Sequence, residues 1–167
     1  MIEVREAEPS EFAEAGRVTA DAYREFTRGD DPSDWSEYLE RIADVEARAD
    51  RTTILVAVED GRILGSLTLE LEGRVREDHE HEALAPDEAH VRMLGVDPGA
   101  RRRGIARALM VEVESRALAA GKTRITLHTT QRMRAAQRLY EGSGFERAPD
   151  LVFPDGFVLL GYTKQLV

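Results

Sequence analysis

Four arginines lie around one glycine in the stretch Val91–Met110, which reads VRMLGVDPGARRRGIARALM. The glycine is Gly104, and the arginines are Arg101, Arg102, Arg103 and Arg107. The pattern predicts a strand, a tight turn and then a helix that begins near the glycine. The first amides of a helix have no partners within it, and the helix dipole favours anions there. Since glycine lets a ligand approach the backbone and arginine binds phosphate oxygens bidentately, the segment predicts a diphosphate site.

The spacing excludes two common phosphate motifs. No Gly-Lys-Ser or Gly-Lys-Thr follows the turn, so the segment is not a Walker A loop, and it lacks the GxGxxG dinucleotide fingerprint. The simpler alternative is a surface loop that carries several solvated arginines. The spacing of Arg101, Gly104 and Ala106 is weak evidence alone, and its place between a strand and a helix strengthens it.

The rest of the chain predicts the strands and helices that would position this segment. Alternating or β-branched apolar residues predict strands at 2–7, 52–58, 62–71, 89–96, 124–129 and 157–166. Apolar residues at helical spacing predict helices at 10–26, 35–45, 101–120 and 133–141. This order predicts an α/β fold, in which a mixed sheet carries helices on both faces.

Turn and cap residues mark several of these boundaries. Ser10 is the predicted N-cap of the first helix, and Asp60-Gly61 predicts a hairpin. Gly121 is the predicted end of the helix at 101–120, whose buried face would include Leu118.

Composition favours a soluble globular protein with one domain. The chain has 167 residues, of which 42% are hydrophobic and 33% charged. No apolar run approaches the ~20 residues of a membrane span, and the N-terminal MIEVREAEPS is too acidic for an export signal. The absence of cysteine excludes disulfides and thiolate metal sites, and we expect a cytoplasmic protein.

The net charge of −9 belongs to the N-terminal third. Residues 1–50 hold 15 acidic residues and six arginines, whereas acids and bases balance over residues 51–167. Acidic surfaces repel nucleic acid and attract cations, so we expect no nucleic-acid partner and no membrane partner. Solubility alone is the alternative explanation of this imbalance.

The segment around Gly104 resembles the central motif of the GNAT superfamily of N-acetyltransferases. That motif is Arg or Gln, two residues, Gly, one residue, and Gly or Ala, and Arg101, Gly104 and Ala106 match it. The preceding MLGVDP matches the usual approach to the motif. RAAQRLYEGSGF, which contains Tyr140, and the closing LGYTKQL are also typical of the family. The resemblance covers residue 52 to the C-terminus well, and the N-terminal helices by order and length.

The resemblance implies a GNAT-like fold, a mixed and mostly antiparallel sheet with a splayed parallel pair and helices on both faces. It implies acetyl-CoA as co-substrate, with its pantetheine arm between the strands at 89–96 and 124–129. The implied cofactor-binding residues are Met93, Leu94, Val96, Arg101, Arg102, Arg103, Gly104, Ile105 and Ala106. Residues 1–167 would form a single domain, with acceptor-side helices at 1–50 and an acetyl-CoA-binding core at 52–167. One departure is Met133, where many relatives have an asparagine that touches the cofactor.

Acetyl transfer to an amine needs a neutral nucleophile, donors for the oxyanion and a proton for the leaving thiolate. We expect the backbone N–H of Leu94 to stabilise the oxyanion, and Tyr140 to face the sulfur as general acid. The base is not identified by the sequence: the candidates are Glu70, Glu88, His90 and His128, and Glu88 or His90 could act through water. The run His79–Glu82 is interpreted as a solvated loop, and we expect no metal.

The predicted function is therefore direct acetyl transfer from acetyl-CoA to an amine. In this family the N-terminal helices help form the acceptor site, and here they are acidic, so we expect a cationic acceptor such as a small amine or a lysine-bearing peptide. The alternative is a non-catalytic module that senses acyl-CoA. O-acetylation or transfer of a longer acyl chain also stays open. Families of this kind commonly form homodimers, and the oligomeric state is left open.

Overall fold

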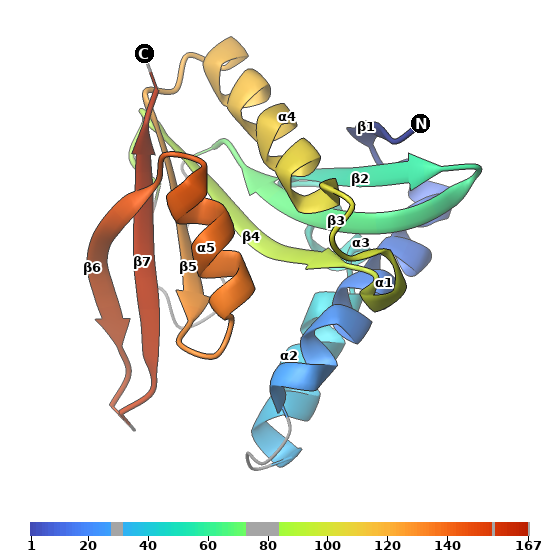
Figure 1. Ribbon diagram of the computed structural model, residues 1–167, viewed down its shortest axis with the longest axis horizontal. Coiled ribbons are helices and arrows are strands. Elements are labelled where there is room, and N and C mark those ends of the chain that lie inside the picture. Colours follow the sequence, from blue (N-terminus) through green and yellow to red (C-terminus); the bar gives the residue numbers. More distant parts are fainter. Residues whose placement is uncertain (28–31, 73–83, 155, 167) are drawn as a thin grey trace. The chain divides into compact units, whose positions relative to one another are not determined.

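The computed structural model describes residues 1–27, 32–72, 84–154 and 156–166. Its residues group into two compact units. Figure 1 labels the helices and strands along the chain. The first unit comprises Met1–Leu69 and Met93–Glu112, and the second comprises Glu70–Arg92 and Val113–Val167. Each unit is described by itself below.

Within the described residues, seven strands follow the order β1-β2-β3-β4-β5-β7-β6. Their bounds are β1 Glu3–Glu6, β2 Thr53–Glu59, β3 Arg62–Glu70, β4 Glu88–Val96, β5 Arg124–Thr130, β6 Glu146–Val152 and β7 Val158–Gln165. Strands β4 and β5 pair in parallel, whereas β1 with β2, β2 with β3, β5 with β7 and β6 with β7 pair antiparallel. The predicted mixed and mostly antiparallel sheet is confirmed.

In the first unit, helix α1 (Phe12–Arg24) packs on β2. Alternate residues of β2 face the helix, because side chains along a strand point to opposite faces. The buried cluster consists of Ala15, Val18, Val45, Ile54, Val56, Val58 and Ile63. On the other face, Gly65 of β3 lies against Ile105 and Leu109, which belong to the first turns of helix α4 (Ile105–Ala119). The first unit thus carries helices on both faces of its strands.

The start of α1 differs from the predicted Ser10 cap. A 3₁₀ turn, η1 (Pro9–Glu11), precedes the helix, and the Glu11 carboxylate accepts a hydrogen bond of 2.9 Å from the backbone N–H of Glu8. Glu11 therefore caps this turn through its own side chain, in the manner of a capping box.

The helix predicted at 35–45 is α2 (Pro32–Ala43), which ends two residues earlier, and after a break an unpredicted short helix follows, α3 (Glu46–Ala49). Arg48 explains how the break is stabilised, since this buried side chain donates hydrogen bonds to the carbonyl oxygens of Arg41, Ile42 and Asp44. It also donates to Oγ1 of Thr68 on β3, at 3.0 Å. A buried guanidinium thus satisfies the last carbonyls of α2, which a helix leaves without partners.

Helix α4 begins four residues later than predicted, because Arg102 and Gly104 both have positive φ. Its far end was partly mispredicted. Leu118 is 47% exposed, and Ala117 takes the buried position instead. Gly121 ends the helix as predicted, with φ of 76°.

In the second unit, helix α5 (Arg134–Gly142) packs on β7, where the ring of Tyr140 lies 5.8 Å from that of Tyr162. Strand β6 was not predicted, because its sequence ERAPDLV contains a proline and three charges. Strand β6 accommodates Pro149 for two reasons. It is the last strand in the order, and its register with β7 shifts between Ala148 and Leu151, so the proline need not donate a hydrogen bond to the ladder.

Candidate functional site

Strand β4 contains a backbone irregularity at Met93, whose φ is 54°. A left-handed residue inside a strand interrupts the alternation of side chains, and such strained positions concentrate at functional sites. In the second unit, the parallel register of β4 with β5 runs from Glu88 opposite Arg124 to Val91 opposite Leu127. This register ends two residues before Met93, although both strands continue.

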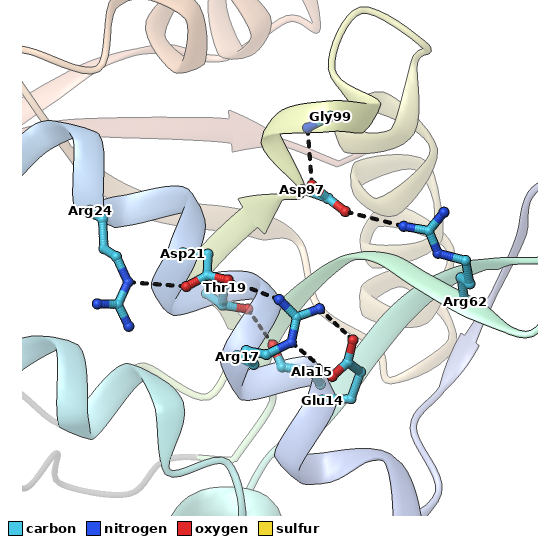
Figure 2. Close-up of polar contacts among 9 residues, drawn as sticks. All are labelled: Glu14, Ala15, Arg17, Thr19, Asp21, Arg24, Arg62, Asp97 and Gly99. Atoms are coloured by element: carbon cyan, nitrogen blue, oxygen red, sulfur yellow. Dashed lines mark hydrogen bonds and ion pairs between the residues drawn. The ribbon is translucent and has the colours of Figure 1, made fainter.

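A tight turn follows β4 and leads to the arginine-rich loop. The Asp97 carboxylate accepts a hydrogen bond of 3.0 Å from the N–H of Gly99, and Arg62 lies 3.9 Å from its other oxygen (Figure 2). The N–H of Asp97 donates to the carbonyl of Leu64 on β3, at 2.8 Å. The 3₁₀ turn η3 (Pro98–Ala100) is therefore fixed to the sheet of the first unit before the loop begins.

The loop from Arg101 to Gly104 turns sharply into α4. Arg102 has φ of 65° and Gly104 has φ of 76°. A Cβ built on Gly104 would meet no atom within 4 Å, so this side of the helix start is open. The side chain of Ile105 is 1% exposed, so only its backbone can serve a ligand. The first amides of α4 have no partner within the helix, and an anion-binding site at this helix start stays a prediction.

The loop arginines differ in their partners. Arg101 forms an ion pair with Glu25, and Arg103 donates a hydrogen bond of 2.6 Å to Glu59. That guanidinium holds the pKa of the Glu59 carboxyl below its usual range. Arg102 and Arg107 have no ion-pair partner within the described parts of the chain. Two guanidinium groups are thus available to an anion without breaking an existing pair.

All nine predicted cofactor residues lie in the first unit, on β4 and on the loop and first turn of α4. The described residues leave Gly104 without a steric neighbour and two arginines without ion-pair partners, and a helix start with these features suits a diphosphate. Met93, Leu94 and Val96 are each half-buried along β4.

Tyr140 lies in the second unit, on the buried side of α5, and is 5% exposed. Its ring contacts those of Phe145 and Tyr162. Burial raises the pKa of its hydroxyl well above the usual range, and the charge of Tyr162 adds to this. Buried tyrosine hydroxyls usually have a hydrogen-bond partner, yet that of Tyr140 has none among the residues described. The hydroxyl is therefore protonated and available to donate.

The base candidates also lie in the second unit. Glu88 accepts a hydrogen bond from the Thr126 hydroxyl, and Thr126 Oγ1 lies 2.7 Å from Nδ1 of His90. The rings of His90 and His128 are 5.7 Å apart. Glu70 is buried, with an oxygen 3.5 Å from the guanidinium of Arg92. The predicted loop at His79–Glu82 lies outside the described residues.

Three contributors to these sites were not predicted from the sequence. Nothing in the sequence distinguishes Glu25 and Glu59 from other acidic residues. Their pairing with Arg101 and Arg103 is visible only in the fold. Thr126 could have been identified from the parallel register, since that register sets it opposite His90.

Met133 stands at the position where many relatives have an asparagine that touches the cofactor. It is buried, it precedes α5, and its sulfur accepts a hydrogen bond of 3.5 Å from the Thr129 hydroxyl. No polar group of Met133 is therefore offered to a ligand.

No group of three or more potential metal ligands occurs among the described residues. Within the same residues, no helix has both the length and the apolar character needed to span a bilayer.

The model of the acetyltransferase (GNAT) family matches residues 18–145. The chain therefore belongs to the GNAT family of acetyltransferases, and the resemblance seen in the sequence is confirmed. No curated protein sequence matches it significantly.

Solved structures with the same fold include the PaiA N-acetyltransferase of Thermoplasma acidophilum in complex with coenzyme A, with a TM-score of 0.76, 15% identity and 99% of each chain covered. YncA of Salmonella typhimurium, a putative acetyltransferase with acetyl-CoA, has a TM-score of 0.70 at 19% identity, over 99% of this chain and 94% of that one. The ribosomal-protein-S18-alanine N-acetyltransferase of Escherichia coli has a TM-score of 0.65, also at 19% identity and with the same coverage.

Proposed function

We propose that this protein transfers the acetyl group of acetyl-CoA directly to an amine. The observation that carries the proposal is the turn into α4, where Gly104 is open and Arg102 and Arg107 lack ion-pair partners among the described residues. These groups suit the pyrophosphate of CoA. The structural relatives crystallised with CoA and acetyl-CoA support the same ligand.

The irregular backbone at Met93 supports a role for β4 in stabilising the oxyanion. A residue with positive φ redirects its neighbouring amides away from the ladder, where they can donate to a ligand. We assign the N–H of Leu94 to the oxygen that becomes negative when the amine attacks the thioester. Donors already in place at that oxygen lower the barrier, because they need no reorganisation during the reaction.

We assign Tyr140 to the departing sulfur. Its raised pKa keeps the hydroxyl protonated, so it can donate a hydrogen bond to the thiolate as the C–S bond breaks. Full proton transfer is uphill, since an ordinary thiol has a pKa of ~8.5 and tyrosine one of ~10 even before burial. The physical argument therefore favours hydrogen-bond donation over the complete proton transfer expected from the sequence.

A cationic acceptor is part of the proposal, and α2 carries the charges that favour it. On α1, Arg17 and Arg24 form ion pairs with Glu14 and Asp21 (Figure 2), so these acids are already neutralised. The exposed carboxylates that stay unpaired among the described residues include Glu37 and Glu40 of α2. Unpaired carboxylates attract cations more strongly than neutralised ones do.

Release of free CoA from acetyl-CoA over a panel of amines tests the function. The panel should contain a polyamine, an amino sugar, a lysine-bearing peptide, a neutral aromatic amine and an acidic amino acid. We expect acetylation of at least one cationic member. Turnover of neutral or acidic amines alone would contradict the cationic acceptor, and failure to bind CoA would contradict the whole assignment.

A non-catalytic acyl-CoA sensor is the second candidate, and the buried thioether of Met133 favours it. The residue offers no polar contact at a position where many relatives use asparagine. CoA binding measured by calorimetry, together with no CoA release over the amine panel, would support the sensor over the enzyme.

A further inference from the structure

Two glycines on neighbouring strands of the first unit let helices approach the sheet closely. Gly65 belongs to β3 and Gly95 to β4, which adjoins β3 in the strand order. A Cβ built on Gly65 would lie 3.2 Å from the carbonyl oxygen of Gly95, so the two glycines lie side by side. Neither has positive φ, so glycine provides space at both positions rather than an unusual backbone conformation.

Gly65 faces helix α4. Its partner on β2 is Ala57, which alternates with the residues that face α1 and therefore points to the opposite side of the sheet. On that side, a Cβ built on Gly65 would lie 2.9 Å from Cγ2 of Ile105 and 3.2 Å from Cδ1 of Leu109. Since carbon atoms pack best at ~3.5–4.0 Å, either α4 or the strand would have to move to admit a methyl group.

The contact with Ile105 passes such a movement on to the start of α4. Ile105 is the first residue of this helix, and its side chain is fully buried. A β-branched side chain in a helix has one strongly preferred χ1, so Cγ2 does not rotate away from an added methyl group. The flexible end of Leu109 can move by itself, whereas Cγ2 moves only together with the backbone of Ile105. Gly65 therefore sets how closely the first amides of α4 approach the sheet.

Gly95 faces helix α1 instead. A Cβ built on Gly95 would lie 3.0 Å from Cα of Thr19 and 3.1 Å from Cβ of Ala22. These atoms belong to the helix backbone or are bonded directly to it, so only a movement of α1 or of β4 could make room. Helix α1 in turn packs closely on α2 at Gly16. An added methyl group at Gly95 would thus act on the helices to which we assign the acceptor.

We infer that these two glycines are positioning residues for two different substrates. Gly65 positions the start of α4 for acetyl-CoA, and Gly95 positions α1 for the amine. The inference rests on the proposed function, which assigns the pyrophosphate to the start of α4 and the acceptor to the N-terminal helices. A glycine needed only for folding would affect both substrates alike, whereas a positioning glycine affects one of them.

The experiment compares Gly65→Ala with Gly95→Ala, which add the same methyl group toward different helices and so serve as matched controls for each other. Calorimetric titration gives the Kd of CoA and the fraction of protein that binds it, without any acceptor. With an amine that the wild type acetylates, steady-state kinetics give the KM of that amine. The double variant Gly65→Ala/Ile105→Leu tests the route through Ile105, because leucine has nearly the same volume as isoleucine but no branch at Cβ.

We expect Gly65→Ala to raise the Kd of CoA about fivefold or more, because hydrogen bonds weaken steeply once their geometry is disturbed. The KM of the amine should stay unchanged in this variant. Gly95→Ala should show the opposite result, an unchanged Kd of CoA and a KM of the amine raised by a similar factor. Ile105→Leu should return the CoA affinity of Gly65→Ala to near that of the wild type.

Three results would overturn the inference. The first is an unchanged Kd of CoA in Gly65→Ala, and the second is an equal loss of CoA affinity in Gly65→Ala and Gly95→Ala. The third is a loss in Gly65→Ala that Ile105→Leu does not reverse. A wild type that binds CoA but acetylates no amine contradicts the proposed function instead, while the CoA titrations still decide the role of Gly65. If Gly65→Ala does not fold by itself, the CoA affinities of the double variant and of Gly95→Ala decide.

Discussion

Arg103 of the loop before α4 is bonded to Glu59, the last residue of β2, through a hydrogen bond of 2.6 Å. The guanidinium of Arg103 could bind a phosphate, and here it is paired with the carboxylate of Glu59 from the same unit. A diphosphate at the helix start and the carboxylate of Glu59 would therefore compete for one guanidinium.

Replacing Glu59 with Gln should strengthen CoA binding slightly, because the competing charge is removed. An exposed ion pair contributes ~0–1 kcal/mol, so the gain in affinity should not exceed about fivefold. Calorimetric titration with CoA measures it. Glu14→Gln is the control, since it removes one carboxylate of the first unit without touching a loop arginine. Weaker binding by Glu59→Gln would instead show that Glu59 orients Arg103 for the ligand.

Arg102→Ala and Arg107→Ala should weaken CoA binding more than the same change at Arg101. Neither has an ion-pair partner among the described residues, so each offers its full charge to an anion, whereas Arg101 is already paired with Glu25. A charge-assisted hydrogen bond contributes ~1.5–3 kcal/mol, and we expect losses of about tenfold or more. Titrations at several salt concentrations should also give a shallower salt dependence for both variants. Equal losses at all three positions would contradict the distinction drawn from the ion pairs.

Gly104→Ala and Gly61→Ala form a matched pair of substitutions. Both glycines have positive φ, 76° and 74°, and neither has an atom within 4 Å of a built Cβ. A left-handed alanine costs ~1–2 kcal/mol, so each variant should lower Tm by a few degrees, at ~2–4 °C per kcal/mol for this chain length. Only Gly104→Ala should also weaken CoA binding, at least tenfold, since its methyl group stands at the helix start. If the two variants bind CoA equally, the open side of Gly104 is not the ligand site.

Tyr140→Phe should lower kcat about tenfold or more, because the hydroxyl that we assign to the leaving sulfur is lost. Stability should change little, since that hydroxyl has no hydrogen-bond partner among the described residues. The raised pKa keeps Tyr140 protonated at ordinary assay pH, so no alkaline loss of activity should come from its ionisation. Unchanged turnover of Tyr140→Phe across the pH range would remove this residue from the mechanism.

The Arg5–Glu11 pair should contribute to stability in acid. Two hydrogen bonds of 2.9 and 2.8 Å from Arg5, and a backbone bond from Glu8, lower the pKa of Glu11 from 4.5 to about 2. Since the folded-state value is the lower one, the stabilisation is complete above pH 4.5 and is lost as the pH falls to about 2. Urea titrations over this interval should show a weaker pH dependence for Glu11→Gln than for the wild type. An identical pH dependence would show that the pair does not act on folding.

Much of the fold could be predicted because its strands and helices have strong local patterns. The β2–β3 hairpin at Asp60-Gly61, strand β5 and the end of α4 at Gly121 follow from alternation and turn chemistry alone. Strand β6 could not be predicted, because Pro149 argues against a strand in the absence of neighbours. Its pairing with β7 and its register shift are tertiary effects.

The sequence predicts where the helix of the candidate site begins, but it does not predict which side chains contact one another there. The helix start at Gly104 is visible in the spacing of Arg101, Gly104 and Ala106. The residues that pair with the arginines, and the threonine that connects Glu88 with His90, come from distant parts of the sequence. Only the tertiary fold brings such residues together.

Gly16 of α1 lies directly against α2, because a Cβ on it would come within 2.0 Å of the carbonyl oxygen of Ala43. Any larger residue at position 16 would push the two helices apart. The close spacing of α1 and α2 therefore depends on glycine at this position. For the acceptor side proposed above, a change of acceptor would therefore come more readily from side chains of α2 than from the spacing of the two helices. Adaptation to a bulkier amine by moving these two helices apart would begin with the loss of this glycine.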